Sequence, residues 1–327
     1  MARRNRSRDG TQLPGSPGAL TVNGVTLRAH LPVMLTEVMD ALLQRTSGYF
    51  VDATFGRGGH TEVMLARLDS HARVFAFDRD PEAVKSRPDL AADPRLEIIH
   101  APFSAASTLL AERGVAGNLC GVLLDLGVSS PQLDDPARGF SFRADGPLDM
   151  RMDPTRGQSV ADWLNAAPEN VIRDCLWELG EERKSRQIAA RICETRRTHP
   201  FTTTHQLAGL VRQIVRTERR IDPSTRTFQA LRLFINDELG ELRRGLATLA
   251  DMLAIAGRLV VISFHSLEDR IVKRYFRDLA RNSADEAPGD AKRFRVVFRR
   301  PLVPTEDEIA QNPRARSARL RVLERVG

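Results

Sequence analysis

Cysteine is scarce in this sequence, and long apolar runs are missing. The 327 residues include three cysteines, Cys120, Cys175 and Cys193, and none belongs to a Cys-x-x-Cys pair. This usage argues against disulfides and against a cysteine-rich zinc site. We assign no metal ligands, and whether a metal assists stays open. No stretch of about 18 apolar residues, the length that spans a bilayer, is present. We therefore expect a soluble globular protein with reduced thiols and no membrane partner.

The N-terminus lacks the apolar core of a secretory signal. The first 18 residues carry Arg3, Arg4, Arg6 and Arg8 together with glycine and proline. Basic segments with so few apolar residues are typical of disordered tails. We assign a disordered basic tail to residues 1–28 and expect the protein to be cytoplasmic.

Short apolar segments alternate with helical patterns along most of the chain. They lie at residues 49–53, 73–77, 96–100, 121–126 and 259–264. This alternation is typical of an α/β fold with a doubly wound parallel sheet. Residues 29–133 and 226–327 are assigned to this core.

Residues 134–225 form a segment that is much longer than the single crossover helix a parallel sheet requires. Helical patterns cover residues 169–179, 184–197 and 203–216. We predict an inserted helical domain that recognises the substrate. Beyond it, apolar residues at steps of three and four from Phe228 to Leu253 predict one long helix or two, bent near Gly240 or Gly245. We interpret those apolar positions as core.

A glycine-rich turn follows the first predicted strand, and a carboxylate follows the second. Gly56, Gly58 and Gly59 allow the backbone to turn tightly and approach a ligand, and Asp78 could accept two ribose hydroxyls. An ordinary strand-to-helix turn is the alternative for glycines alone. Asp52, Asp78, Asp125 and His265 all lie at or beyond the ends of predicted strands, where open α/β sheets bind ligands. The sequence thus predicts a pocket for a nucleotide-type cofactor.

Polar loops follow the fourth predicted strand. Ser129, Ser130 and Pro131 come after Asp125 and would form a rigid turn beside the cofactor. Its carbonyl and carboxylate oxygens could hold the protons of an exocyclic amine, although a plain helix cap explains the same residues. The segment 138–153 is dense in arginine, aspartate and aromatic residues without regular periodicity, which is common in binding loops.

The charge of the chain favours a polyanionic partner. The formal net charge is +7, and this sign suits nucleic acid. An arginine-rich solvated surface is the alternative. Basic residues gather near the C-terminus at Arg293, Arg295, Arg299, Arg300, Arg314, Arg316, Arg319 and Arg321. In the insert they are Arg183, Lys184, Arg186, Arg196, Arg197, Arg212, Arg216, Arg219 and Arg220, where acids intersperse them.

Six longer motifs carry a family resemblance that spans nearly the whole chain beyond the tail. They are HLPVM at 30–34, DATFGRGGH at 52–60, DLGVSSPQ at 125–132, FSF at 140–142 with DMRM at 149–152, TFQALR at 227–232 and SFHSLEDR at 263–270. Together they resemble the bacterial small-subunit ribosomal RNA cytosine-N4 methyltransferase family. The resemblance implies a Rossmann-like class I methyltransferase core, S-adenosylmethionine as cofactor, and one cytosine N4 in the decoding region of 16S rRNA as target.

The resemblance also implies which residues contact the cofactor. These are Gly58, Gly59, His60, Asp78, Phe103, Asp125 and Gln132. Asp78 suits the ribose diol, and Asp125 could reach the methionine amine or the target amine. Phe103 offers an apolar face to adenine, but a core aromatic is the simpler reading from sequence alone. His60 could instead orient the loop.

The expected reaction is direct methyl transfer to the amine of a flipped cytosine, without a covalent enzyme–base intermediate. A cysteine nucleophile would be needed for carbon-5 methylation, and no cysteine lies in a strand-end loop. For the catalytic group we predict Asp125 with the backbone at Ser129 and Ser130, and His265 as second choice.

Other candidates in the site remain unranked. Asp149 and Asp153 are further carboxylates, and Phe140 or Phe142 could either stack on the base or pack in the core. Two other functions also compete, an NAD-dependent dehydrogenase and a non-catalytic RNA-binding protein. The loop lacks the dehydrogenase pattern Gly-x-Gly-x-x-Gly, which favours the methyltransferase.

The expected partner is small-subunit rRNA within an assembled or nearly assembled 30S subunit. Free rRNA stays open as an alternative, and so does the oligomeric state, including a dimer. The segment 283–290 is rich in alanine, glycine, proline and acids, and is predicted to be a mobile loop.

Overall fold

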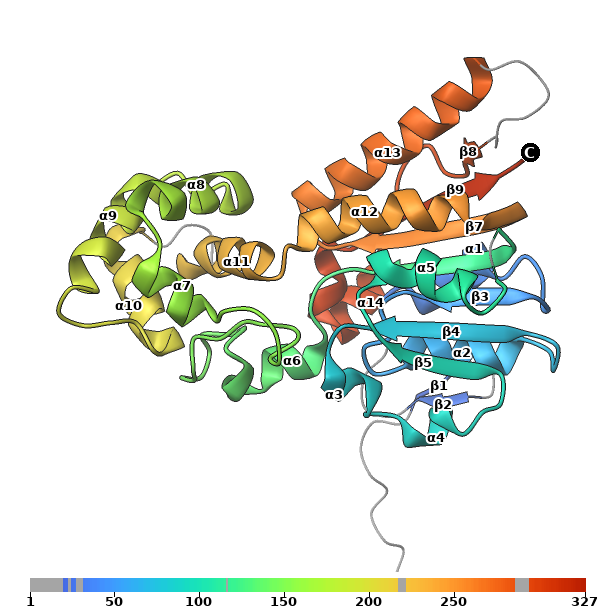
Figure 1. Ribbon diagram of the computed structural model, residues 1–327, viewed down its shortest axis with the longest axis horizontal. Coiled ribbons are helices and arrows are strands. Elements are labelled where there is room, and N and C mark those ends of the chain that lie inside the picture. The colour runs from blue at the N-terminus through green and yellow to red at the C-terminus, as the bar shows by residue number, and fades with distance from the viewer. Residues whose placement is uncertain (1–19, 23–24, 28–31, 116, 217–221, 286–293) are drawn as a thin grey trace, which may run out of the picture.

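A seven-stranded sheet forms the centre of the larger part of the molecule (Figure 1). The computed structural model describes residues 20–22, 25–27, 32–115, 117–216, 222–285 and 294–327. The strand order is β5-β4-β3-β6-β7-β9-β8. In chain order the strands are β3 (Tyr49–Asp52), β4 (Arg73–Asp78), β5 (Leu96–His100), β6 (Leu119–Asp125), β7 (Leu253–Ser263), β8 (Phe294–Val296) and β9 (Arg319–Arg325). Strands β3 to β7 pair in parallel, which confirms the predicted doubly wound sheet.

Two further strands, β8 and β9, extend the sheet beyond the sequence prediction. Strand β9 pairs antiparallel to β7, and β8 pairs antiparallel to β9. The arginines of β9 made this segment look like a basic loop in the sequence. In the structure, charged residues of β9 form ion pairs with other residues of the fold. Arg321 pairs with Asp269 at 2.7 Å, and Glu324 pairs with Arg258 and Arg295, each at 2.8 Å. Arg321 and Arg295 therefore pair with acids of the fold, and the binding of nucleic acid by the C-terminal arginines stays a prediction.

Helices cover both faces of the sheet because alternate strand residues point to opposite sides. Phe50 and Leu123 pack with helices α1 (Leu35–Leu42) and α2 (Gly59–Arg67). Val51 and Leu124 pack on the other face. The helices there are α5 (Ala106–Ala111), α12 (Glu238–Asp251) and α13 (Ser266–Asp285). The result is a three-layer α/β/α core.

Short helices shape the loops at one end of the sheet. They are α3 (Pro81–Val84), α4 (Pro88–Ala91), α6 (Ser130–Asp134) and α14 (Glu306–Gln311), with single 3-10 turns η1 (Phe103–Ala105), η2 (Pro136–Arg138) and η3 (Pro313–Ser317).

A group of helices stands to one side of the sheet and has its own core (Figure 1). It contains α7 (Val160–Ala166), α8 (Glu169–Gly180), α9 (Ser185–Thr195), α10 (Thr204–Ile214) and α11 (Ser224–Ile235). The three helices predicted within the insert are thus present as α8, α9 and α10. Helix α11 packs on α8, because Gly180 gives the backbone of Arg226 room to approach. Phe228 and Leu231 of α11 therefore belong to the core of the helical group.

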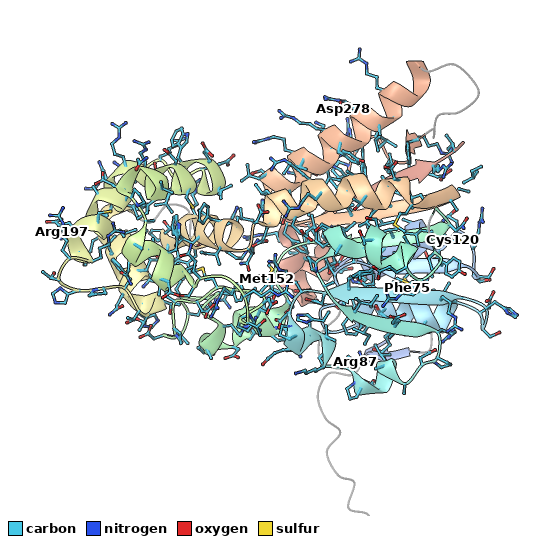
Figure 2. The ribbon with its side chains drawn as sticks, viewed as in Figure 1. Phe75, Arg87, Cys120, Met152, Arg197 and Asp278 are labelled. Atoms are coloured by element: carbon cyan, nitrogen blue, oxygen red, sulfur yellow. The ribbon has the colours of Figure 1, made fainter. Side chains whose placement is uncertain are left out.

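The chain between α11 and α12 breaks at Asn236 and Asp237, earlier than the predicted bend near Gly240 or Gly245. The Asn236 side chain accepts a hydrogen bond from the Met152 amide at 2.8 Å and donates to the Met150 carbonyl at 2.7 Å. Met152 lies at this junction between the helical group and the sheet (Figure 2). The break between α11 and α12 thus coincides with hydrogen bonds from Asn236 to the loop at Met150 and Met152, and not with a glycine.

The N-terminal segment contains a small hairpin. Strands β1 (Leu20–Val22) and β2 (Val25–Leu27) pair antiparallel, so the tail assignment of residues 1–28 fails for these two segments. Their β-branched valines and threonines favour strands. Residues 1–19 lie outside the described residues. Of the predicted loop at 283–290, residues 283–285 belong to α13, and the rest lies outside the described residues. Among the helices that the structure describes, none has the length and apolar character to cross a membrane.

Candidate functional site

A cavity of about 740 Å³ opens where the carboxyl ends of β3, β4 and β6 meet. The sheet order reverses between β3 and β6, since the chain runs from β3 outward to β5 and then returns to the other side of β3. Ligands of open α/β sheets bind at this kind of switch point. The cavity is lined by residues of the loops after these strands, of α12 and of the C-terminal segment.

The glycine-rich turn forms one wall of the cavity. Gly58 has a positive φ of 71°, which glycine adopts without strain. A Cβ on Gly59 would lie 2.6 Å from the Pro32 ring, so only glycine fits there. The Gly56 amide donates to Asp78 at 2.7 Å, and the Asp80 amide donates to the other Asp78 oxygen at 2.8 Å. Backbone bonds therefore fix the Asp78 carboxylate at the cavity edge, while burial raises its pKa.

Phe103, in the turn after β5, forms another wall of the cavity. A Cβ on Gly245 of α12 would lie 2.3 Å from the Phe103 ring, so this glycine makes space for it. The Ser104 amide donates to Glu241 at 2.8 Å, which ties the Phe103 turn to α12. Leu242 of the same helix lines the cavity. Phe103 thus faces the cavity with an apolar ring, and helix α12 supports the ring on its other side.

Asp125 and His60 lie at the deep end of the cavity. His60 Nε2 lies 3.1 Å from the Val33 carbonyl oxygen, which can only accept, so Nε2 carries the proton. Burial lowers the pKa of His60 to about 4, and its unprotonated Nδ1 lies 3.6 Å from Asp125 Oδ2. Burial, with Asp52 and Glu268 nearby, raises the pKa of Asp125 to about 8. Asp125 Oδ1 is buried without a hydrogen-bond partner among the described residues.

Two more buried carboxylates surround Asp125. Asp52 accepts from the Thr61 hydroxyl at 2.7 Å, and burial raises its pKa to about 6. Glu268 accepts from the Phe264 amide at 2.8 Å. Burial acts to raise the pKa of Glu268, but the adjacent His265 and other bonds outweigh it and hold the pKa below its usual value. Negative charge is thereby concentrated behind Asp125.

Gln132 joins the loop after β6 to the loop after β4. Its side chain accepts from the Ser129 amide at 2.9 Å and donates to Asp80 at 2.7 Å. Arg138 donates to the same Asp80 oxygen at 2.8 Å and to the carbonyl of Met152 at 2.9 Å. This network fixes the turn at Ser129 beside Asp125.

The structure brings most of the predicted site residues into this one cavity. Its lining includes Gly59, His60, Asp78, Phe103, Asp125, Ser129, Ser130 and Gln132. Gly58 does not line it, because a Cβ there would meet the Phe55 ring and Leu90, and its role is to shape the turn. His265 does not line it either, since its ring lies against Glu268, with Nε2 at 3.1 Å from Oε1.

The unranked aromatic and acidic candidates lie elsewhere. Phe140 is buried in the core of the helical group, and Phe142 packs edge-on against Phe228 with ring centres 4.8 Å apart. Asp149 pairs with Arg151 at 2.7 Å, and Asp153 binds Thr155 at 2.6 Å. None of these four lines the cavity. Core packing and loop structure explain them.

Several lining residues were not predicted. Glu238, Glu241 and Leu242 come from α12, and Asn312 and Arg314 come from the C-terminal segment. The periodicity of α12 marks Leu242 as a core position, which it is, and gives no sign that its helix also borders a cavity. No pattern in the sequence alone indicates these contacts.

Comparison with known proteins identifies the family. A model described as the MraW methylase family matches residues 28–326. The chain is 51% identical over 312 residues to Ribosomal RNA small subunit methyltransferase H of Methylibium petroleiphilum, covering 93% of this chain and 97% of that protein.

Proteins of the same name from two other bacteria are similarly close. The protein of Nitrosococcus oceani is 49% identical over 309 residues, with 91% of this chain and 98% of that protein covered. The protein of Chromobacterium violaceum is 51% identical over 307 residues, with 91% and 95% covered. The chain therefore belongs to the MraW methylase family.

Proposed function

We propose that this protein transfers a methyl group from S-adenosylmethionine to the exocyclic N4 of a cytosine in the decoding region of small-subunit rRNA. The family match supports methyl transfer, and the printed names of the relatives support small-subunit rRNA as substrate. The single observation that carries the chemistry is the Asp125 carboxylate, which lines the cavity beside the turn at Ser129 and whose Oδ1 has no hydrogen-bond partner among the described residues.

The cavity fits S-adenosylmethionine. Asp78 has a carboxylate at the edge that can accept ribose hydroxyls while it keeps its two backbone donors. Phe103 presents an apolar ring for the adenine, and the unpartnered Asp125 Oδ1 can accept from an amine. When bound, the cofactor supplies an electrophilic methyl group on a positively charged sulfur.

Asp125 would orient the target amine and accept its proton. The lone pair of a cytosine N4 is delocalised into the ring, so acceptors that hold its protons favour attack by nitrogen. With a pKa raised to about 8, Asp125 is largely protonated at neutral pH in the absence of a ligand, and only its ionised form can accept a proton. A positive charge within the cavity would favour the ionised form of Asp125. The carbonyls of the turn at Ser129 and Ser130 can hold the second amine proton.

Direct transfer is favoured over covalent attack on the base. None of the three cysteines lines the cavity. Cys175 lies in the helical group, and burial raises the pKa of its thiol to about 12. A thiolate nucleophile is therefore not available near Asp125.

The substrate would be the assembled or nearly assembled 30S subunit in the cytoplasm.

The test is methylation of undermethylated small subunits with labelled S-adenosylmethionine, followed by nucleoside mapping. We expect N4-methylcytidine with the wild type. Asp125→Asn should lower the rate by about 10²- to 10⁴-fold, the usual contribution of a positioned base. Asp149→Asn, a carboxylate outside the cavity, is the matched control. A product methylated on carbon 5 or on ribose would overturn the proposal.

A further inference from the structure

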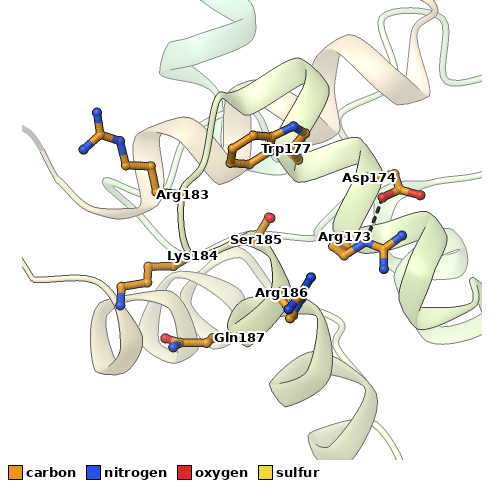
Figure 3. Close-up of a pocket in the computed structure, with 8 residues that line it drawn as sticks. All are labelled: Arg173, Asp174, Trp177, Arg183, Lys184, Ser185, Arg186 and Gln187. Atoms are coloured by element: carbon orange, nitrogen blue, oxygen red, sulfur yellow. Dashed lines mark hydrogen bonds and ion pairs between the residues drawn. The ribbon is translucent and has the colours of Figure 1, made fainter.

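A second pocket lies on the helical group, between α8 and the start of α9 (Figure 3). Its volume is about 470 Å³, and it is lined by Arg173, Asp174, Trp177, Arg183, Lys184, Ser185, Arg186 and Gln187. We call it the Trp177 pocket. It shares no lining residue with the cavity at the sheet. Its role is therefore separate from holding the cofactor.

The aromatic wall of this pocket is unusually open. Trp177 is 59% exposed, whereas the other tryptophan, Trp163, is 6% exposed and packs on Phe234 with ring centres 4.5 Å apart. Large aromatic side chains are normally buried to a high degree. An indole face left in solvent beside cations is a platform on which a nucleobase can stack.

The charges around the indole are mostly unpaired cations. The only carboxylate in the lining, Asp174, pairs with Arg173 at 2.8 Å. Arg183, Lys184 and Arg186 are exposed, and none of them pairs with an acid within the described part of the chain. Figure 3 shows Trp177 and Ser185 on opposite sides of the pocket, with Arg183 and Lys184 at one end and Arg173 at the other. The pocket thus attracts anions.

The floor of the pocket is the N-terminus of α9. The turn before it is held by buried Glu182, which accepts from the Lys184 amide at 2.9 Å. No side chain caps the first turn of α9. Ser185 is 5% exposed, and its hydroxyl has no hydrogen bond to another described residue. A positive helix end with a free hydroxyl donor is suited to a phosphate group.

We propose that the Trp177 pocket binds one nucleotide of a single-stranded RNA segment. The phosphate lies at the start of α9 among Arg183, Lys184 and Arg186, and the base stacks on Trp177. A nucleic acid offers both an anion and a flat ring, and unpaired RNA exposes its bases for stacking. That the strand is ribosomal rests on the proposed function.

Tryptophan fluorescence tests the stacking directly. A short single-stranded oligoribonucleotide of mixed sequence should quench the emission of the full-length wild type. Trp177→Phe should abolish the quenching while it keeps most of the affinity, and Trp177→Ala should weaken binding by about tenfold. Trp163→Phe, which removes the buried indole, is the control and should keep the quenching. Quenching that is lost in Trp163→Phe and kept in Trp177→Phe would overturn the proposal.

Salt dependence tests the phosphate contact. Replacing Arg183, Lys184 and Arg186 together with serine should reduce the slope of log affinity against log salt by about 0.7 per cation, or about 2 in total. The matched control replaces three exposed cations of α13, Lys273, Arg274 and Arg281, with serine. If both triple variants lost the same slope, the salt dependence would come from the overall positive charge of the protein. The phosphate contact at Arg183, Lys184 and Arg186 would then be wrong.

Methylation assays separate this inference from the proposed function. With small subunits, Trp177→Ala should raise KM about tenfold and leave kcat and the Kd for S-adenosylmethionine unchanged. If the wild type binds the oligonucleotide through Trp177 but methylates no rRNA, the proposed function fails and the pocket stands. If the variants methylate subunits like the wild type, the pocket assignment fails. If they bind naked RNA normally but lose affinity for subunits, the partner is a protein and the RNA assignment is wrong.

Discussion

The cavity at the sheet and the Trp177 pocket use polar residues in opposite ways. In the cavity, carboxylates are buried and already held by the protein, as Asp78 is by the amides of Gly56 and Asp80. In the Trp177 pocket, Arg183, Lys184 and Arg186 are exposed and pair with no acid among the described residues. The first arrangement is preorganised for one small molecule, and the second is an electrostatic surface for a polymer. Single substitutions should therefore have large effects in the cavity and graded effects in the pocket.

The largest effect on cofactor binding is expected at Asp78. Asp78→Ala removes a charged acceptor of two ribose hydroxyls and leaves two amides without their partner, so the affinity for S-adenosylmethionine should fall by about 100-fold. Calorimetry on the purified variant measures it. Asp153→Ala removes a carboxylate that is also largely buried but lies outside the cavity, and should bind the cofactor normally. If Asp78→Ala and Asp153→Ala lost the same affinity for S-adenosylmethionine, the claim that the cavity holds the cofactor through Asp78 would be wrong.

An intermediate effect is expected in the pH dependence of stability. Asp125 has a pKa of about 8 in the folded chain, against 3.8 ordinarily, so the folded state binds a proton that the unfolded state has released. The stability from this group is complete below about pH 4 and is lost as the pH rises through about 8. Asp125→Asn should therefore gain stability over the wild type as the pH rises.

Thermal unfolding between about pH 6.5 and pH 9 measures this gain, because His60, with its pKa lowered to about 4, stays neutral in that window. Asp149→Asn is the control, since the pKa of Asp149 lies below its usual value. A stability difference between Asp125→Asn and the wild type that does not change with pH would contradict the buried, protonated state of Asp125.

The smallest effect is expected from the exposed indole. Trp177→Ala should change the free energy of unfolding by no more than about 0.5 kcal/mol, as exposed substitutions usually do. Trp163→Ala should cost about 3–5 kcal/mol because it empties a packed site. Urea denaturation of both variants measures the contrast. A large loss in Trp177→Ala would show that the indole serves the fold and not a ligand.

Sequence patterns predicted the central sheet and the position of the cavity well. Apolar runs marked β3 to β7, and the carboxylates that end β4 and β6 marked the sheet edge where the cavity lies. Strand β9 was not predicted, because its arginines look like a basic segment in the sequence although they pair with acids within the fold. Charge pairing depends on contacts between distant residues, which composition does not record.

The finer features of the two sites were less accessible. Helical periodicity gives the same signal for a residue in a core and for Leu242, which also borders the cavity. Trp177 lies in a helical pattern where a tryptophan is usually core, so nothing in the sequence distinguished it from buried Trp163. Phe140 and Phe142 differ from Trp177 in the opposite direction. They lie in an irregular loop, where exposed aromatic residues were considered for stacking, but the structure packs them against other side chains.

Asn236 gives the two sites a fixed separation. Its amide bonds the loop at Met150 and Met152, and its carbonyl accepts from Arg79 beside the cavity at 2.7 Å. Asn236 is buried at the junction, and its contact with Arg79 ties the helical group to the sheet. The molecule therefore holds the cavity and the Trp177 pocket at a constant distance. An RNA strand that occupies both sites must bend to match that distance.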